Sequence, residues 1–137
     1  MRGNYIVDGS NLVRTLYGFD ERHLPQDALL SRQFIEELEV YSAGWDPGVR
    51  VLVIFDGPPR WKTEPLTEDA PVQVQFCPEK TADETIVGKA RFLRHSKQKV
   101  TIVTEDRSLA QKIVEEGARW LRPPLFLKKM RNAGKRR

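Results

Sequence analysis

Four aspartates stand where short, apolar, β-prone runs of this sequence end or where a helix is expected to begin. They are Asp8, Asp56, Asp83 and Asp106. The carboxyl ends of parallel strands in an open α/β sheet share one edge, where ligands bind, so the four side chains are expected to converge. Two carboxylates about 4 Å apart repel by roughly 4 kcal/mol at an effective dielectric of 20. A cluster of four therefore indicates a bound cation or a raised pKa.

An all-carboxylate cluster selects a particular kind of cation. Oxygen donors without His or Cys suit Mg²⁺ or Mn²⁺, whereas zinc and copper prefer nitrogen and sulfur. A bound ion of this kind can activate water as a nucleophile, and a second ion can steady the leaving oxygen. The residues alone therefore predict a metal-dependent hydrolase acting on a phosphoanion. Each aspartate by itself has an ordinary explanation, as a turn residue for Asp8 and Asp56 or through the helix dipole for Asp83 and Asp106.

The elements that must position these acids alternate along the chain. The apolar and helical periodicities favour an α/β sandwich with a mostly parallel sheet. The helix that carries Asp83 opens with a capping box, in which Thr81 is the cap and Glu84 stands three residues later. Strands are expected at residues 5–7, 49–55, 72–76, 100–103 and 118–121, and helices at 10–18, 25–43, 81–95 and 107–116.

Length and composition exclude several classes of protein. With 137 residues, 39% of them hydrophobic, the chain is expected to form one domain with one core. The single cysteine, Cys77, excludes a disulfide framework, and the two histidines, His23 and His95, have no metal-ligand spacing. The longest apolar run, residues 51–55, is far shorter than the roughly 20 residues that span a bilayer. Without a signal-peptide core in residues 1–8, we expect a cytoplasmic location and no membrane partner.

Positive charge is concentrated at the C-terminus. The last ten residues hold six cations and no acid, and the remainder has 17 basic against 19 acidic residues. A basic C-terminal tail at residues 123–137 suggests a polyanionic partner, nucleic acid first, and the alternative is a solubilising, frayed terminus. The six cations are Lys128, Lys129, Arg131, Lys135, Arg136 and Arg137.

Four motifs together resemble a known family. Residues 5–11, Tyr-Ile-Val-Asp-Gly-Ser-Asn, resemble the opening of NYN domains, a branch of the PIN-like nuclease superfamily, in which the first strand ends in Asp-Gly-x-Asn. Residues 53–57, Val-Ile-Phe-Asp-Gly, resemble the second strand, and residues 81–86, Thr-Ala-Asp-Glu-Thr-Ile, resemble the Thr-Ala-Asp helix start of the YacP-like branch. Residues 103–107, Val-Thr-Glu-Asp-Arg, resemble the element in which Thr and Asp end a strand. The motifs occur in family order, whereas residues 122–127 match no family motif.

The resemblance implies a PIN-like three-layer α/β/α sandwich over residues 1–122, with a central, mostly parallel sheet of four or five strands. It also implies an acidic site that binds Mg²⁺ or Mn²⁺ and acts on RNA. Carried over by position, the four aspartates would be the catalytic metal ligands, with Asn11 as a polar partner of the first. Behind them would lie Thr104, Ser10 and Glu84, although the capping box also explains Glu84.

Cations near the acids are expected to contact the substrate. The run Arg60-Trp61-Lys62 follows Asp56, so Trp61 could stack an unpaired base while its neighbours hold phosphate. The alternative is that Trp61 folds back over the edge of the core. Further phosphate contacts are expected from Arg107 and, in the tail, from Lys128, Lys129 and Arg131.

The leading functional hypothesis is an endoribonuclease that cleaves single-stranded or structured RNA with a metal-activated water. A phosphatase with an aspartyl-phosphate intermediate is the second hypothesis, but such enzymes usually need another Asp two residues after the first, where this chain has Ser10. A third is a non-catalytic module that binds metal and RNA in a ribosome- or RNA-associated assembly, possible partners being the ribosome or another protein. The absence of a P-loop or G-x-G-x-x-G motif argues against a nucleotide cofactor.

Overall fold

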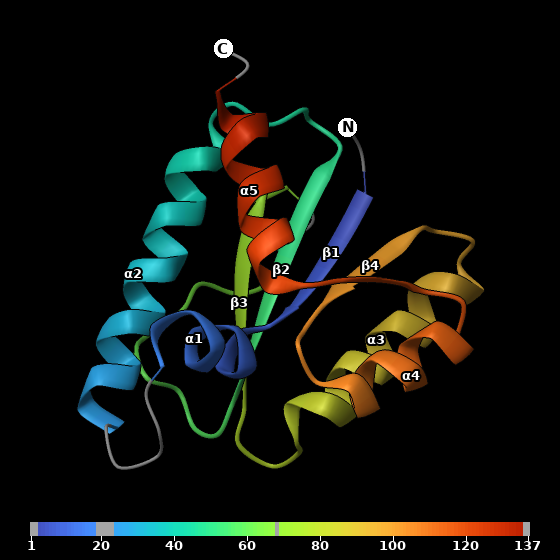
Figure 1. The fold of residues 1–137 in the computed structure, drawn as a ribbon, viewed down its shortest axis with the longest axis horizontal. Helices are drawn as coiled ribbons and strands as arrows, with labels where there is room; N and C mark the ends of the chain where they lie inside the picture. Colours follow the sequence, from blue (N-terminus) through green and yellow to red (C-terminus); the bar gives the residue numbers. More distant parts are fainter. Residues whose placement is uncertain (1–2, 19–23, 68, 136–137) are drawn as a thin grey trace.

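A computed structural model describes residues 3–18, 24–67 and 69–135, and shows a central sheet of five parallel strands (Figure 1). The predicted sheet is therefore confirmed, with all five strands parallel. His23, Arg136 and Arg137 lie outside the described residues. The strands are β1 (Gly3–Asp8), β2 (Val49–Asp56), β3 (Val72–Cys77), β4 (Val100–Val103) and β5 (Arg119–Leu121).

Helices cover both faces of the sheet and make the predicted three-layer sandwich. On one face lie α1 (Gly9–Tyr17), α2 (Leu24–Ser42) and α5 (Pro123–Gly134), as Figure 1 shows. On the other lie α3 (Ala82–His95) and α4 (Arg107–Glu115). Within the described ranges, no helix combines the length and the apolar character that a membrane crossing requires.

Alternation along the central strands divides the buried side chains between two cores. Tyr5 and Val7 of β1 pack toward α1, α2 and α5, whereas Ile6 packs toward α3 and α4. Successive side chains of a strand point to opposite faces, so a strand covered on both faces must be apolar at almost every position. This explains why residues 51–55 read as a continuous apolar run.

The order of the strands creates a topological switch point at one edge of the sheet. The order is β3-β2-β1-β4-β5, so the chain builds outward from β1 through β2 and β3, then crosses to β4 on the other side. Strand order therefore reverses between β1 and β4. In open α/β sheets, ligands bind outside the carboxyl ends of the strands at such a switch point. Asp8 ends β1 at this position, and Thr104 follows β4.

The C-terminal segment corrects the sequence analysis. Residues 123–137 were expected to form a tail outside the domain, but most of them form α5, which packs against α1 and α2. Phe126 and Met130 are fully buried, and the Trp45 indole Nε1 donates a hydrogen bond of 3.0 Å to the Met130 carbonyl. The signal for this helix is the helical spacing of Phe126, Met130 and Ala133, which the cations of the segment do not reveal.

Two glycines allow the ends of α2 and α5 to meet. A Cβ added to Gly44, just after α2, would lie 2.2 Å from the carbonyl oxygen of Gly134 in α5. A Cβ on Gly134 would lie 2.8 Å from the carbonyl oxygen of Tyr41. Backbone atoms fill both positions, so the docking of α5 depends on the missing side chains.

Gly44→Ala is expected to destabilise the fold by about 1–3 kcal/mol, because overpacking pushes the α5 backbone away from α2. The measurement is the free energy of unfolding in urea, followed by circular dichroism. The matched control is Gly88→Ala in α3, where an added Cβ meets nothing within 4 Å. This control is expected to stabilise the helix by about 0.5–1 kcal/mol. A Gly44→Ala protein as stable as the wild type would contradict the close packing of α5.

Candidate active site at the carboxyl edge of the sheet

Asp8 is the most buried of the four aspartates, with only 4% of its surface exposed. It ends β1 and caps α1, and its Oδ1 accepts a hydrogen bond of 3.4 Å from the backbone N–H of Asn11. Its Oδ2 accepts one of 3.1 Å from the Thr104 hydroxyl. A Cβ on Gly9 would lie 2.7–2.8 Å from side-chain atoms of Phe55 and Val53, so glycine lets α1 start directly against β2. Close packing therefore holds Asp8 in its buried position.

Burial raises the pKa of the Asp8 carboxyl from its ordinary value of 3.8 to about 7. The negative charges of Asp83 and Asp56 raise it further, while the hydrogen bonds from Thr104 and Asn11 lower it. Desolvation is the largest cause, because a carboxylate removed from water loses its hydration. Asp8 consequently changes its charge near neutral pH.

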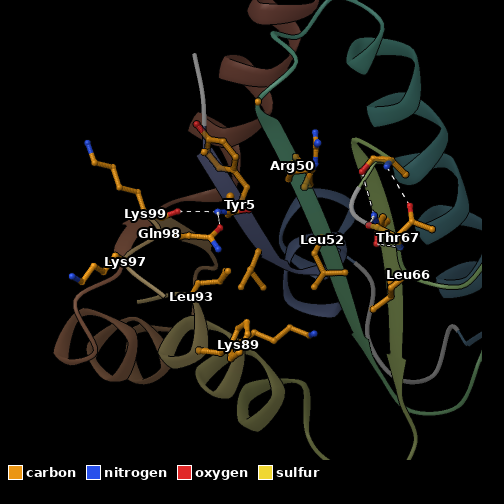
Figure 2. A pocket seen from close by; sticks show the side chains of 18 residues that line it. Tyr5, Arg50, Leu52, Leu66, Thr67, Lys89, Leu93, Lys97, Gln98 and Lys99 are labelled. Carbon is orange, nitrogen blue, oxygen red and sulfur yellow. Dashed lines mark hydrogen bonds between the residues drawn. The ribbon is translucent and has the colours of Figure 1, made fainter. Parts of the chain in front are cut away.

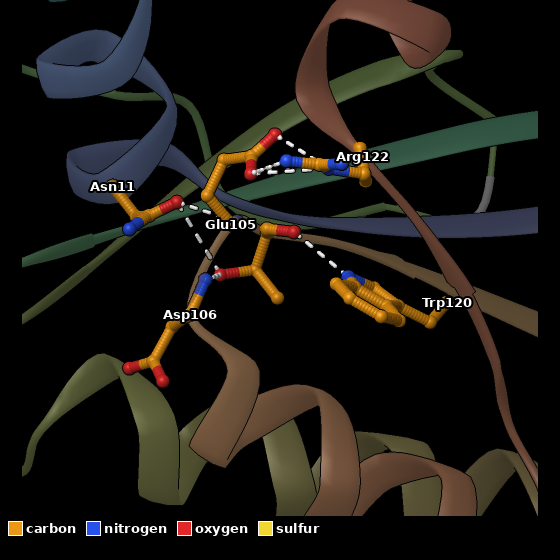
Figure 3. Close-up of polar contacts among 6 residues, drawn as sticks. Asn11, Glu105, Asp106, Trp120 and Arg122 are labelled. Atoms are coloured by element: carbon orange, nitrogen blue, oxygen red, sulfur yellow. Dashed lines mark hydrogen bonds and ion pairs between the residues drawn. The ribbon is translucent and has the colours of Figure 1, made fainter.

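A polar network joins β1, α1 and the loop after β4, and Figure 3 shows the part of it between Asn11 and residues 105–106. The Asn11 Oδ1 accepts a hydrogen bond of 2.8 Å from the Glu105 amide and lies 3.4 Å from the Thr104 hydroxyl. The hydroxyl of Thr104, which is fully buried, donates to Asp8 and accepts a bond of 3.0 Å from the Asp106 amide. One side chain thus links the first and the fourth aspartate across the switch point.

Asp56 is held by contacts from two different helices. Its amide donates a hydrogen bond of 3.0 Å to the Ser10 hydroxyl of α1. Its Oδ1 accepts one of 2.7 Å from the Ala82 amide, at the first residue of α3. Because Ala82 is followed directly by Asp83, the carboxylate of Asp56 also fixes where the third aspartate enters the site.

Asp83 and Asp106 stand at the starts of α3 and α4. The Oδ1 of Asp106 caps α4 by accepting hydrogen bonds from the amides of Ser108 and Leu109, at 2.9 and 3.1 Å. Burial raises the pKa of Asp83, and the charges of Asp106 and Asp56 raise it further. The charges of Asp56 and Asp83 thus raise the pKa of Asp8, and those of Asp56 and Asp106 raise the pKa of Asp83.

The donor chemistry of this cluster fits a hard divalent cation. All four side chains offer oxygen, the ligand preferred by Mg²⁺ and Mn²⁺. Among the described residues, Oδ2 of Asp56 and of Asp106 accepts no hydrogen bond, so each retains a free oxygen. Within the same residues, no group of three or more His, Cys, Asp or Glu side chains is arranged to enclose a metal ion. The aspartates supply suitable ligands without forming a closed coordination shell.

Two cations face this acidic edge from neighbouring helices. Lys112 of α4 and Arg14 of α1 both lower the pKa of Asp83, partly offsetting the effect of the other acids. Arg107, expected to contact phosphate, is exposed at the first position of α4. Lys112 was not singled out from the sequence, because its approach to Asp83 depends on how α4 packs against α3.

Glu84 is exposed, and its amide donates to the Thr81 cap at 3.2 Å, in agreement with the capping box.

The loop after Asp56 places Trp61 on the edge of the core, which was the alternative expectation for this residue. Its ring meets Phe76 edge-on at 4.9 Å between centroids and Phe55 at 5.8 Å. The guanidinium of Arg32 lies 5.4 Å above the ring, and that of Arg60 lies 5.1 Å from the Phe55 centroid. Lys62 is exposed. Trp61 is therefore packed against the core and is partly covered by Phe55, Phe76 and Arg32.

The structure does not bring the cations of α5 to the acids. Arg131 donates a hydrogen bond of 3.2 Å to the Tyr41 hydroxyl, near the end of α2. The ammonium of Lys129 lies 5.7 Å from the Tyr5 ring centroid, and Lys128 is exposed. From its start near the carboxyl edge, α5 runs toward the amino ends of β1 and β2 (Figure 1). Contacts between these residues and RNA therefore stay a prediction.

A separate hollow of about 1020 Å³ lies at the amino ends of β1 and β2, beside α3 (Figure 2). Leu52 and Leu93 contribute apolar surface, and Lys89, Lys97 and Lys99 contribute positive charge. None of the four aspartates lines it. The acidic edge is therefore distinct from this larger concavity.

Comparison with known proteins supports this fold. The family model of the YacP-like NYN domain matches residues 5–137, which includes α5. The crystal structure of Rae1 (YacP) from Bacillus subtilis is 24% identical, with a TM-score of 0.72 over 99% of this chain and 77% of that one. The structure of its W164L mutant is 22% identical, with a TM-score of 0.72 over 97% of this chain and 77% of that one. No curated protein matches the sequence significantly.

The raised pKa of Asp8 predicts that its ionisation weakens the metal-free fold as pH increases. The pKa of Asp8 is about 7 in the folded protein and 3.8 ordinarily. The stability that the protonated Asp8 contributes is therefore fully present below about pH 4 and is lost as the pH rises to about 7. Asp8→Asn has no such penalty. In EDTA, its stability relative to wild type is expected to rise by up to roughly 1.4 kcal/mol per pH unit across that window and then level off. Urea unfolding at several pH values measures the difference, and a difference that does not vary with pH would contradict the raised pKa.

Proposed function

Since this chain belongs to the YacP-like NYN domain family, which has a PIN-like ribonuclease fold, we propose that it is a metal-dependent endoribonuclease. The observation that supports the proposal is the position of the four aspartates, with Asp8 and Asp56 ending β1 and β2 and Asp83 and Asp106 at the starts of α3 and α4. The pKa of Asp8 and that of Asp83 are raised partly by neighbouring carboxylates. Such repulsion is compensated when a cation binds among the acids. RNA is the proposed substrate, and its phosphates supply further oxygen ligands.

The four aspartates are the proposed ligands of Mg²⁺ or Mn²⁺. A bound ion of this kind activates water and neutralises charge on the phosphate oxygens during hydrolysis. Asp8 must lose its proton to act as a ligand, so metal affinity should increase as pH rises toward its pKa of about 7. Thr104 and Asn11 orient Asp8, while Ser10 orients the backbone that carries Asp56.

Cations around the acids are proposed to hold the RNA backbone. Arg14 and Lys112 already act electrostatically on Asp83, and Arg107 is exposed next to Asp106. Positive charge beside an acidic site counters the repulsion between carboxylates and phosphates. The loop residues Arg60, Trp61 and Lys62 follow the carboxyl end of β2 and are proposed to extend this surface. A ribosome or protein partner and a cytoplasmic location stay predictions from the sequence.

The phosphatase alternative receives less support from the geometry. An aspartyl-phosphate enzyme that used Asp8 as its nucleophile would usually need another Asp two residues later. The position two residues later holds Ser10, whose hydroxyl accepts a bond from the Asp56 amide. A hydrolytic water positioned among the acids is therefore the better proposal.

Metal binding is expected to stabilise the wild-type protein. Mn²⁺ at about 100 times its dissociation constant should add roughly 2.7 kcal/mol of stability, seen as an increased Tm that EDTA reverses. Asp8→Asn should lose most of this increase because one proposed ligand is removed. Asp69→Asn, at an exposed carboxylate in the loop before β3, is the control and should retain it. An equal increase for all three proteins would argue against binding at the acidic edge.

Cleavage of an end-labelled single-stranded RNA tests the activity directly. Cuts are expected with Mg²⁺ or Mn²⁺ and not with EDTA, and Asp8→Asn should reduce the rate by about 100-fold or more. Thr104→Val, which removes the hydroxyl while keeping the shape, should reduce it by about 10- to 100-fold through the orientation of Asp8. Asp69→Asn should cleave at the wild-type rate. RNA that is bound but uncut under every metal condition would instead support a non-catalytic metal- and RNA-binding module.

A further inference from the structure

A second hollow, of about 490 Å³, adjoins the acidic edge between β5 and α4. Its lining includes Trp120 of β5, Arg122 just beyond that strand, and Arg107 and Val114 of α4. Its volume lies within the roughly 300–1,000 Å³ typical of small-ligand sites. Glu105 and Arg107, the chain neighbours of Asp106, both line the hollow, although none of the four aspartates does.

Trp120 presents an aromatic surface whose orientation is fixed. Trp120 is 40% exposed. Its indole Nε1 donates a hydrogen bond of 2.8 Å to the Thr104 carbonyl, which fixes the orientation of the ring. The hydroxyl of the same threonine donates to Asp8. A single buried residue, Thr104, therefore contacts both the indole and the first aspartate. Figure 3 shows the hydrogen bond of the indole.

The other two tryptophans do not offer a comparable surface. Trp45 is 7% exposed and donates its indole hydrogen to the Met130 carbonyl inside the core. Trp61 packs against Phe76 and lies beneath the Arg32 guanidinium. Among the three tryptophans, all within the described residues, Trp120 alone combines an exposed ring with a position beside the acids.

Charged side chains line the hollow beside Trp120. Arg122 makes a two-pronged ion pair with Glu105, with contacts of 2.8 and 3.2 Å, and Figure 3 shows its guanidinium directed at Glu105. Arg107 is exposed, and Glu115 also lines the hollow. β5 is a three-residue edge strand, too short to favour pairing with another sheet.

We propose that Trp120 and the hollow beside it bind one base of the RNA, in a nucleotide next to the phosphate that is cleaved. The base stacks on the indole face, and Arg107 meets the adjoining phosphate. Stacking of this kind tolerates any base, because every base has a π-face. This inference rests on the proposed ribonuclease function and adds to it a subsite for the substrate.

Two substitutions separate stacking from a structural role of the indole. Trp120→Phe keeps an aromatic face and loses the bond to Thr104, whereas Trp120→Leu loses both. The probe is a fluorescein-labelled single-stranded RNA in Mg²⁺, bound by proteins that also carry Asp8→Asn so that it remains intact. Trp120→Leu is expected to weaken binding by about 5- to 100-fold, the range for one lost base stack, and Trp120→Phe by less than about threefold. The control, Phe92→Leu, alters an exposed aromatic residue in α3 that lines the other hollow and should leave binding unchanged.

The outcomes distinguish this inference from the proposed function. In the active protein, Trp120→Leu should raise KM for RNA with little change in kcat. If wild type cleaves RNA and Trp120→Leu binds and cleaves equally well, the subsite is overturned while the nuclease stands. If wild type binds RNA through Trp120 and never cleaves it, the subsite stands while the nuclease falls. Equal losses in the Phe and Leu variants would assign Trp120 to positioning Thr104, and a changed oligomeric state with unchanged RNA binding would assign it to a contact between copies.

Discussion

The burial of one carboxylate at the switch point is the constraint on which the rest of the site depends. Asp8 sits at the end of the central strand, where the sheet and α1 exclude water, and its pKa is raised to about 7. A buried carboxylate is tolerated only when hydrogen bonds or a cation compensate its charge. The amide of Asn11 and the hydroxyl of Thr104 provide the hydrogen bonds, and each belongs to a different element. Satisfying Asp8 therefore ties α1 and β4 to β1.

The same requirement extends to the other acids. Asp56 is bound by groups from α1 and α3, and Asp106 caps α4. Asp56 and Asp106 thus each have structural partners through one oxygen, whereas both oxygens of Asp8 accept hydrogen bonds. Neighbouring carboxylates raise the pKa of Asp8 and of Asp83, and perturbed pKa values of this kind cluster at functional sites. Placement at the switch point gives such a site access to a substrate from outside the sheet.

The helices divide between supporting the site and completing the core. On one face, α3 and α4 begin with Asp83 and Asp106 near their starts, so their N-termini converge on the acidic edge. On the other face, α5 contributes fully buried Phe126 and meets the end of α2 through paired glycines. The C-terminal helix is part of the domain, and the match to the family model through residue 137 agrees with this. Its cations lie along a supporting element rather than in the acidic site.

Local sequence determined the strands, their order along the chain and the acids at their ends, because periodicity, caps and terminal residues depend on near neighbours. Those features predicted the sandwich and the convergence of the four aspartates. The spacing of Phe126, Met130 and Ala133 favours a helix in residues 123–134, but only the tertiary structure decided that this helix packs against α1 and α2. It also decided that the charge of Lys112 acts on Asp83 and that the Trp120 indole reaches Thr104. These contacts join residues on separate elements, through α3–α4 packing and β4–β5 pairing, so no local pattern in the chain could specify them.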